Sequence, residues 1–129
     1  MSAEAPTRVS IAAGPLVGPV LRRVVGMFAA RADLPLDRLD DAVLVADLVG
    51  ARAPGHVLAD TVEVALTSGP RALDLRIGPL RAGGGRALVV QAAVPGVGNV
   101  IEQLADDVEV ETEGEHDYLV VRLAYAGSD

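Results

Sequence analysis

The chain has 129 residues, the size of one domain, and a domain of this length buries roughly 68% of its unfolded surface in a single core. Half of the residues are apolar but only 2% are aromatic, so few rings are available for stacking on nucleic-acid bases. The net charge of -7 repels phosphate backbones and anionic membrane surfaces, and we expect neither a nucleic acid nor a membrane as partner.

Residue types that are missing exclude further classes of chemistry. All 11 basic residues are Arg, and without Lys the chain has no P-loop lysine and no Schiff-base nucleophile. Without Cys it has no disulfides, thiolate nucleophiles or Cys-ligated metal sites. The N-terminus lacks a signal-peptide pattern and no apolar run is long enough to span a bilayer, so we expect a cytoplasmic protein.

The first half of the chain predicts one strand and two helices. Residues 8–13 alternate between apolar and polar, which predicts a short strand. Apolar residues at 16–31 recur at helical spacing, and the ADLP segment at 32–35 ends that helix. A second helix is expected at 36–52, where Ala-Pro-Gly at 53–55 stops it.

The next segments predict a hairpin followed by a helix. Residues 61–68 and 72–77 alternate on either side of a Gly-Pro turn at 69–70, which is typical of an antiparallel hairpin. Residues 79–86 are rich in glycine and are expected to be flexible. The apolar run at 87–94 fits either a short helix or a buried strand, and we favour the helix.

The last segments predict a helix at about 97–105 and a closing hairpin formed by 107–113 and 118–125, with a turn at 114–117. This order of elements predicts an α+β fold, a two-layer sandwich with helices on one face of a mixed, mostly antiparallel sheet. We expect one domain over 7–125, with frayed termini at 1–6 and 126–129.

Three segments, together with the order of elements, carry a resemblance to a known family. They are LDDAVLVADLV in the second helix, the strand LDLRIGPL, and the tail GVGNVIEQLADDVEVETEGEHDYLVVRL. The chain resembles the GHKL, or histidine-kinase-like, ATPase domain, and more narrowly the short cytoplasmic serine kinases that act as anti-sigma factors. The resemblance covers about residues 7–125 and implies the histidine-kinase-like ATPase fold.

The resemblance implies a Mg-ATP site with three features, of which the first lies on the second helix. There the family carries a Glu that acts as general base through a water, and one helical turn later an Asn that holds Mg²⁺. Here Asp47 pairs with Ala51, or Leu48 with Arg52, depending on the register. Neither register supplies the Asn, and the one that we prefer places Leu48 at the Glu.

Asp47 lies at the border of the apolar stripe of that helix. The stripe consists of Leu36, Leu39, Val43, Ala46 and Gly50. Leu44 and Leu48 lie well round from it, on the face where the family meets ATP. We interpret Asp47 as a boundary carboxylate that is solvated or hydrogen-bonded, because unpaired burial of a charge is costly. The alternative is a displaced general base.

The second and third features are an adenine acceptor and a phosphate cradle. The family places an Asp after the third strand as the adenine acceptor. This chain reads IGPL around Gly78 at that place and has no Asp there. Asp74 lies within the strand, on its solvated face. The run Gly83-Gly84-Gly85 fits a mobile lid or a plain flexible connector. Gly96, Gly98 and Asn99 fit a phosphate-binding helix entry or an ordinary cap. The predicted remnant of the nucleotide pocket is Leu44, Leu48, Arg52, Gly78, Gly83, Gly84, Gly85, Gly96, Gly98 and Asn99.

No metal site is expected elsewhere, because His56 and His116 lie beside turn signals and lack a second ligand at metal spacing. The favoured hypothesis is a regulatory protein-binding module, a GHKL-like domain without catalytic residues and without a cofactor. The resemblance implies a sigma factor or an anti-sigma-factor antagonist as partner, and self-association through the first strand and first helix. The alternative is an active Mg-ATP-dependent serine kinase with Asp47 as base. A carrier of small apolar ligands ranks third.

Overall fold

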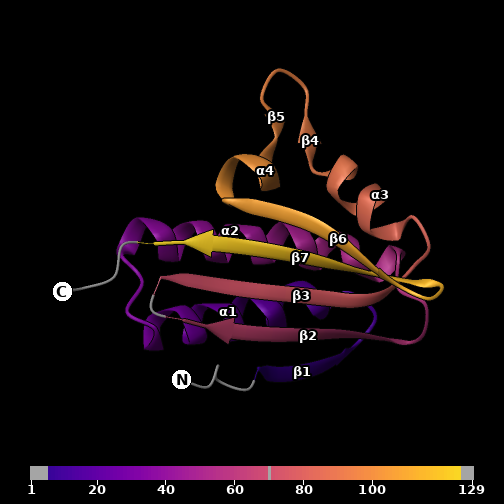
Figure 1. The fold of residues 1–129 in the computed structure, drawn as a ribbon, viewed down its shortest axis with the longest axis horizontal. Helices are drawn as coiled ribbons and strands as arrows, with labels where there is room; N and C mark the ends of the chain where they lie inside the picture. Colours follow the sequence, from indigo (N-terminus) through magenta and orange to yellow (C-terminus); the bar gives the residue numbers. More distant parts are fainter. Residues whose placement is uncertain (1–5, 70, 126–129) are drawn as a thin grey trace.

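The computed structural model describes residues 6–69 and 71–125, and in it a five-stranded sheet carries two long helices on one face (Figure 1). The strands are β1 (Thr7–Ala12), β2 (Thr61–Ser68), β3 (Ala72–Arg81), β4 (Ala93–Val94), β5 (Gly98–Asn99), β6 (Asp107–Glu113) and β7 (His116–Ala124). The helices are α1 (Val17–Arg31), α2 (Leu36–Arg52), α3 (Gly84–Gln91) and α4 (Val100–Leu104), and a 3-10 turn, η1, covers Ala53–Gly55.

The main sheet has the order β1-β2-β3-β7-β6, and every neighbouring pair in it is antiparallel. Strands β4 and β5 form a separate small hairpin. The alternation of β3 continues in three dimensions, since Leu73, Leu75 and Ile77 are buried while Asp74 and Arg76 lie on the open face. The predicted α+β two-layer sandwich is therefore confirmed, with an antiparallel main sheet in place of a mixed one.

The core lies between the sheet and the pair α1 and α2. Aliphatic side chains of moderate size fill it, as the scarcity of aromatic residues requires. The fully buried residues of the two helices are Val17, Leu21, Val25, Ala29, Ala42, Val45, Ala46 and Val49. No helix among the described residues is both long and apolar enough to cross a membrane.

The apolar stripe predicted for α2 is rotated in the structure. Leu36 is 75% exposed, whereas Val45 and Val49 are fully buried. The reason is that α2 buries two faces, one against the sheet and one against α1. A Cβ on Gly50 would lie 2.6 Å from the Cα of Gly18, so the two helices meet backbone to backbone there.

Four predicted boundaries are wrong, one of which is the start of β7, at His116 rather than at residue 118. Strand β3 runs on to residue 81 and α3 begins at residue 84, so little of the stretch 79–86 is a loop. Helix α4 begins at Val100 rather than near residue 97, because residues 98–99 pair with 93–94. The helix favoured at 87–94 is confirmed as far as Gln91. Frayed ends were expected at 1–6 and 126–129, and of these all but residue 6 lie outside the described residues, as does Pro70 of the predicted turn.

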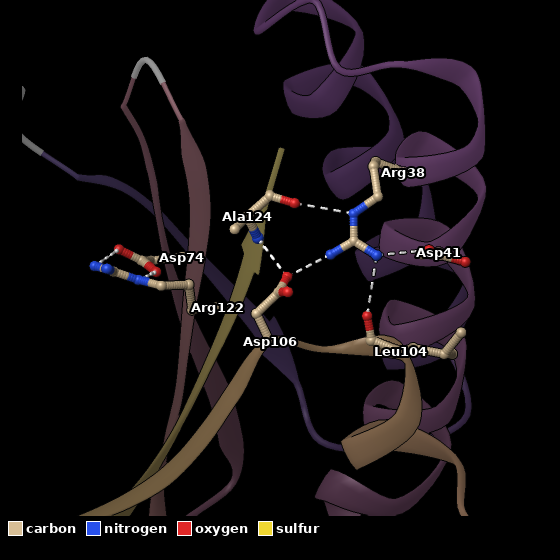
Figure 2. A network of polar contacts seen from close by, with 7 residues as sticks. All are labelled: Arg38, Asp41, Asp74, Leu104, Asp106, Arg122 and Ala124. Atoms are coloured by element: carbon tan, nitrogen blue, oxygen red, sulfur yellow. Dashed lines mark hydrogen bonds and ion pairs between the residues drawn. The ribbon is translucent and has the colours of Figure 1, made fainter. Parts of the chain in front are cut away.

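Arg38, in the first turn of α2, ties three distant segments together (Figure 2). Its Nε donates to the Ala124 carbonyl at 3.0 Å, and Nη1 donates to the Leu104 carbonyl at 3.2 Å and to Asp41 at 2.8 Å. Its Nη2 pairs with Asp106, which also accepts the Ala124 N–H at 2.7 Å. The side chain of Arg38 is only 20% exposed, so little water competes with these hydrogen bonds.

We expect Arg38→Ala to lower the free energy of unfolding by roughly 1–3 kcal/mol, because two carbonyls and two carboxylates lose a charged donor. Arg23→Ala, at an exposed position of α1, is the matched control and should change it by less than about 0.5 kcal/mol. Urea denaturation followed by circular dichroism measures both values. Equal stability of the two variants would contradict this role of Arg38.

Candidate functional site

Helices α3 and α4, whose starts carry the predicted pocket residues Gly84, Gly85 and Asn99, pack against α2 and the sheet. Helix α3 contacts α2, β3 and β7, and α4 contacts α2 and β6. Leu88 and Ala92, at the inner side and end of α3, are fully buried, as is Ile101 of α4. All three belong to the same core cluster as the buried residues of α2. Apolar side chains of the chain itself therefore fill the contact of α3 and α4 with α2 and the sheet.

Polar contacts fix the end of α2 to the end of α3. Arg52 donates from Nε to the Gln91 carbonyl at 3.1 Å and from Nη1 to the Leu48 carbonyl at 3.2 Å. His56 Nε2 lies 3.0 Å from Gln91 Oε1. Leu48 is half-buried and packs against the core. Two predicted pocket residues, Leu48 and Arg52, are thus brought together, but Arg52 is engaged with backbone carbonyls.

The start of α3 is held by a carboxylate that sequence analysis missed. Gly83 has a φ of 81°, a left-handed conformation that favours glycine, and its N–H donates to Asp117 Oδ2 at 2.9 Å. Asp117 Oδ1 accepts from the Thr112 hydroxyl at 3.2 Å. Asp117 is only 5% exposed. It was assigned to a turn, and its partner lies 34 residues away, so no local pattern marked it.

Gly84 and Gly85 are packed helix residues, and the prediction of a mobile or flexible glycine run is wrong. A Cβ on Gly84 would lie 3.3 Å from the Cβ of His56, and one on Gly85 would lie 2.9 Å from Cγ1 of Val110. Both glycines are buried. They let α3 approach η1 and β6 closely, which a larger residue would prevent.

Asn99 caps α4 and joins it to α3. Its Oδ1 accepts the Glu102 N–H at 3.1 Å, and its Nδ2 donates to the Val89 carbonyl at 2.6 Å. Gly96, in the turn of the β4–β5 hairpin, and Gly98, the first residue of β5, have positive φ values of 81° and 99°. The predicted helix entry therefore behaves as an ordinary cap. A helix of five residues has little dipole for binding a phosphate.

Gly78, Leu44 and Asp47 lie apart from these residues. A Cβ on Gly78 would lie 2.6 Å from the ring of Tyr118, on the open face of the sheet. Leu44 and Asp47 line a groove between α1 and α2 on the outer surface. Asp47 is 39% exposed and lies 3.5 Å from Arg22, as expected of a boundary carboxylate.

The open face of the sheet carries paired charges. Arg122 donates to Asp74 from two nitrogens, at 2.8 and 3.1 Å, and this hydrogen bonding raises the pKa of Arg122 above its usual value. Arg76 pairs with Glu111 and Glu113 and stacks 3.7 Å from the centre of the Tyr118 ring. Among the described residues, no three His, Asp or Glu side chains are placed to hold a metal ion. His116 begins β7 rather than lying in a loop.

No protein-family model matches the chain, and no curated protein matches it. Among solved structures, the chain is similar to the crystal structure of the RsbU and RsbW domains of Rv1364c from Mycobacterium tuberculosis, with a TM-score of 0.64 and 15% identity. The likeness covers 95% of this chain and 33% of that one, so this chain spans about a third of its neighbour. At this identity the likeness shows the fold alone, an α+β sandwich that the chain shares with part of that structure.

We expect Leu88→Ala to lower the free energy of unfolding by roughly 2–5 kcal/mol, because it leaves a cavity between α3, α2 and the sheet. Val90→Ala, on the same helix but at a position that is 59% exposed, is the matched control and should cost less than about 1 kcal/mol. Chemical denaturation of both variants provides the test. A small effect of Leu88→Ala would mean that α3 does not close this region in solution.

Proposed function

We propose that the chain is a regulatory protein-binding module of the anti-sigma-factor kind, a GHKL-like domain that acts without Mg-ATP. The observation that carries this proposal is that Arg52 and Asn99, two residues predicted for the nucleotide pocket, bond to carbonyls of α3, while Leu88 of α3 and Ile101 of α4 are buried in the core. The fold shared with a structure that contains an RsbW domain supports the regulatory class. By the resemblance, the partner is a sigma factor or an anti-sigma-factor antagonist.

The residues present do not fit Mg-ATP. Magnesium requires oxygen ligands, and Leu48 and Arg52 offer none from their side chains. The N–H of Glu102 and that of Gly83, which open α4 and α3, already have side-chain acceptors. Phosphate oxygens would have to displace both. We therefore assign no catalytic step to this chain.

The kinase alternative requires Asp47 as a general base. A base must come within hydrogen-bonding reach of the hydroxyl that it deprotonates. Asp47 instead faces Arg22 in the groove between α1 and α2, on a different side of α2 from Arg52 and Gln91. The position of Asp47 therefore favours the binding module over the kinase.

In vitro transcription with RNA polymerase and each sigma factor of the source organism tests the proposed function. We expect the chain to repress transcription by one sigma factor, either directly or by sequestering the antagonist of another anti-sigma factor. The extent of repression should be the same with and without Mg-ATP. Asp47→Asn should act like the unaltered chain, because Asp47 has no chemical role. No phosphate should pass from labelled ATP to either partner.

Two results would contradict the proposal. Transcriptional effects that require Mg-ATP and are lost in Asp47→Asn would support the kinase. The absence of any effect with every sigma factor and antagonist would remove the anti-sigma class altogether.

A further inference from the structure

Strand β6 leaves one edge of the sheet unpaired. Among residues 6–69 and 71–125 it pairs with β7 alone, and six of its seven residues are exposed. In Figure 1 this edge lies next to α3, α4 and the β4–β5 hairpin. An exposed strand edge presents a row of free N–H and C=O groups, which can pair with a strand from another chain.

The hairpin turn determines which backbone groups face outward. Gly114 has a φ of 63° and, with Glu115, forms a two-residue turn that pairs Glu113 with His116. In an antiparallel pair, alternate residues exchange hydrogen bonds with their partner while the residues between them point away. The N–H and C=O groups of Val108, Val110 and Thr112 are therefore directed to the free edge.

The two sides of this edge differ in chemistry. On the open face, Glu109, Glu111 and Glu113 follow one another, and residues 106–115 contain six acids and no base. On the helical side, β6 borders a groove of about 430 Å³ against α3 and α4. Val90 and Val110, which are 59% and 40% exposed, line this groove, as do the oppositely charged Arg86 and Glu102.

The charge of the edge selects its partner. Two copies of β6 placed side by side would bring like charges opposite one another, which is unfavourable across strands. Arg76 offsets part of the charge of Glu111 and Glu113, but Glu109 has no ion-pair partner within 4.0 Å among the described residues. An incoming strand with basic side chains on the open face would supply the missing charge.

We propose that the β6 edge binds an extended segment of another protein in which Lys or Arg alternate with Val, Ile or Leu. The basic side chains lie over the glutamates of the open face, and the apolar side chains enter the groove beside Val90 and Val110. Main-chain hydrogen bonds provide affinity, and the two side-chain rows provide specificity. The inference deepens the proposed function and rests on it in one respect, that the chain works by binding protein.

The experiment uses a fluorescent synthetic peptide of about nine residues, alternating Val and Lys, long enough to span β6. We expect fluorescence anisotropy to show that it binds the full chain about tenfold or more tightly than a peptide alternating Val and Glu. Nuclear magnetic resonance should show that peptide addition protects the amides of Val108, Val110 and Thr112 from exchange. Because no sigma factor is present, failure here is distinguishable from failure in the transcription assay.

Two variants test the assignment. Glu109→Gln should weaken binding of the Val and Lys peptide severalfold, whereas Glu63→Gln, on the open face of β2, should leave it unchanged. Val110→Pro removes an outward N–H without breaking the β6–β7 ladder, and should reduce binding about tenfold. The same spectra show whether Val110→Pro keeps the cross-strand contacts between β6 and β7. If these contacts are lost, the comparison of Glu109→Gln with Glu63→Gln is the test of the proposal.

The proposal is overturned if the Val and Glu peptide binds equally well, or if Glu109→Gln and Glu63→Gln behave alike. It is also overturned if the peptide protects β1 instead of β6. Protection of the β6 amides in the free chain, together with self-association in sedimentation, would assign the edge to a second copy of this chain instead.

Discussion

The docking of α3 and α4 against α2 is the contact on which the rest of the site depends. It buries Leu88 and Ile101 completely, on the two helices whose starts carry residues predicted for the nucleotide pocket. Returning these two side chains to water would cost roughly 3–6 kcal/mol. A ligand with micromolar affinity gains about 8.2 kcal/mol on binding, so this cost would move its affinity toward the millimolar range. The closed arrangement is thus strong enough to decide whether a nucleotide binds.

Polar contacts hold this closed arrangement at several points. Arg38 joins α2 to the ends of α4 and β7, Arg52 joins α2 to α3, and Asn99 joins α4 to α3. Each of these side chains donates to backbone carbonyls. These hydrogen bonds cannot be lost without unfolding the segment that contains the carbonyl. The catalytic family pattern needs side chains that point at a ligand. Here Arg52 and Asn99, which were predicted for the nucleotide pocket, bond to carbonyls of α3 and fix the helices instead.

The hydrophobic pattern predicted much of the fold. The bounds of α2, β2 and β6 agree with the expected ranges, because each element has a clear period and a Gly or Pro signal near its ends. The glycine run at 83–85 was misread, since a glycine required for close packing looks the same in sequence as one in a flexible loop. The start of α4 was misplaced because residues 93–99 form a hairpin too short to show alternation.

The candidate site was less predictable for a related reason. Helical spacing does not say how a helix is rotated when it buries two faces, and Gly50 against Gly18 determines that rotation for α2. Leu44 and Asp47 therefore face the outer groove instead of α3. The carbonyl partners of Arg38 lie 66 and 86 residues away, so only the folded chain reveals its role.

Isothermal titration of the full chain with Mg-ATP tests the central claim most directly, with amide hydrogen exchange of α3 and α4 followed in parallel. The account predicts no saturable heat at micromolar nucleotide and unchanged exchange at Leu88 and Ile101. Micromolar binding that depends on Mg²⁺, accompanied by faster exchange in α3 and α4, would contradict it, because the nucleotide would then be displacing the side chains that close the site.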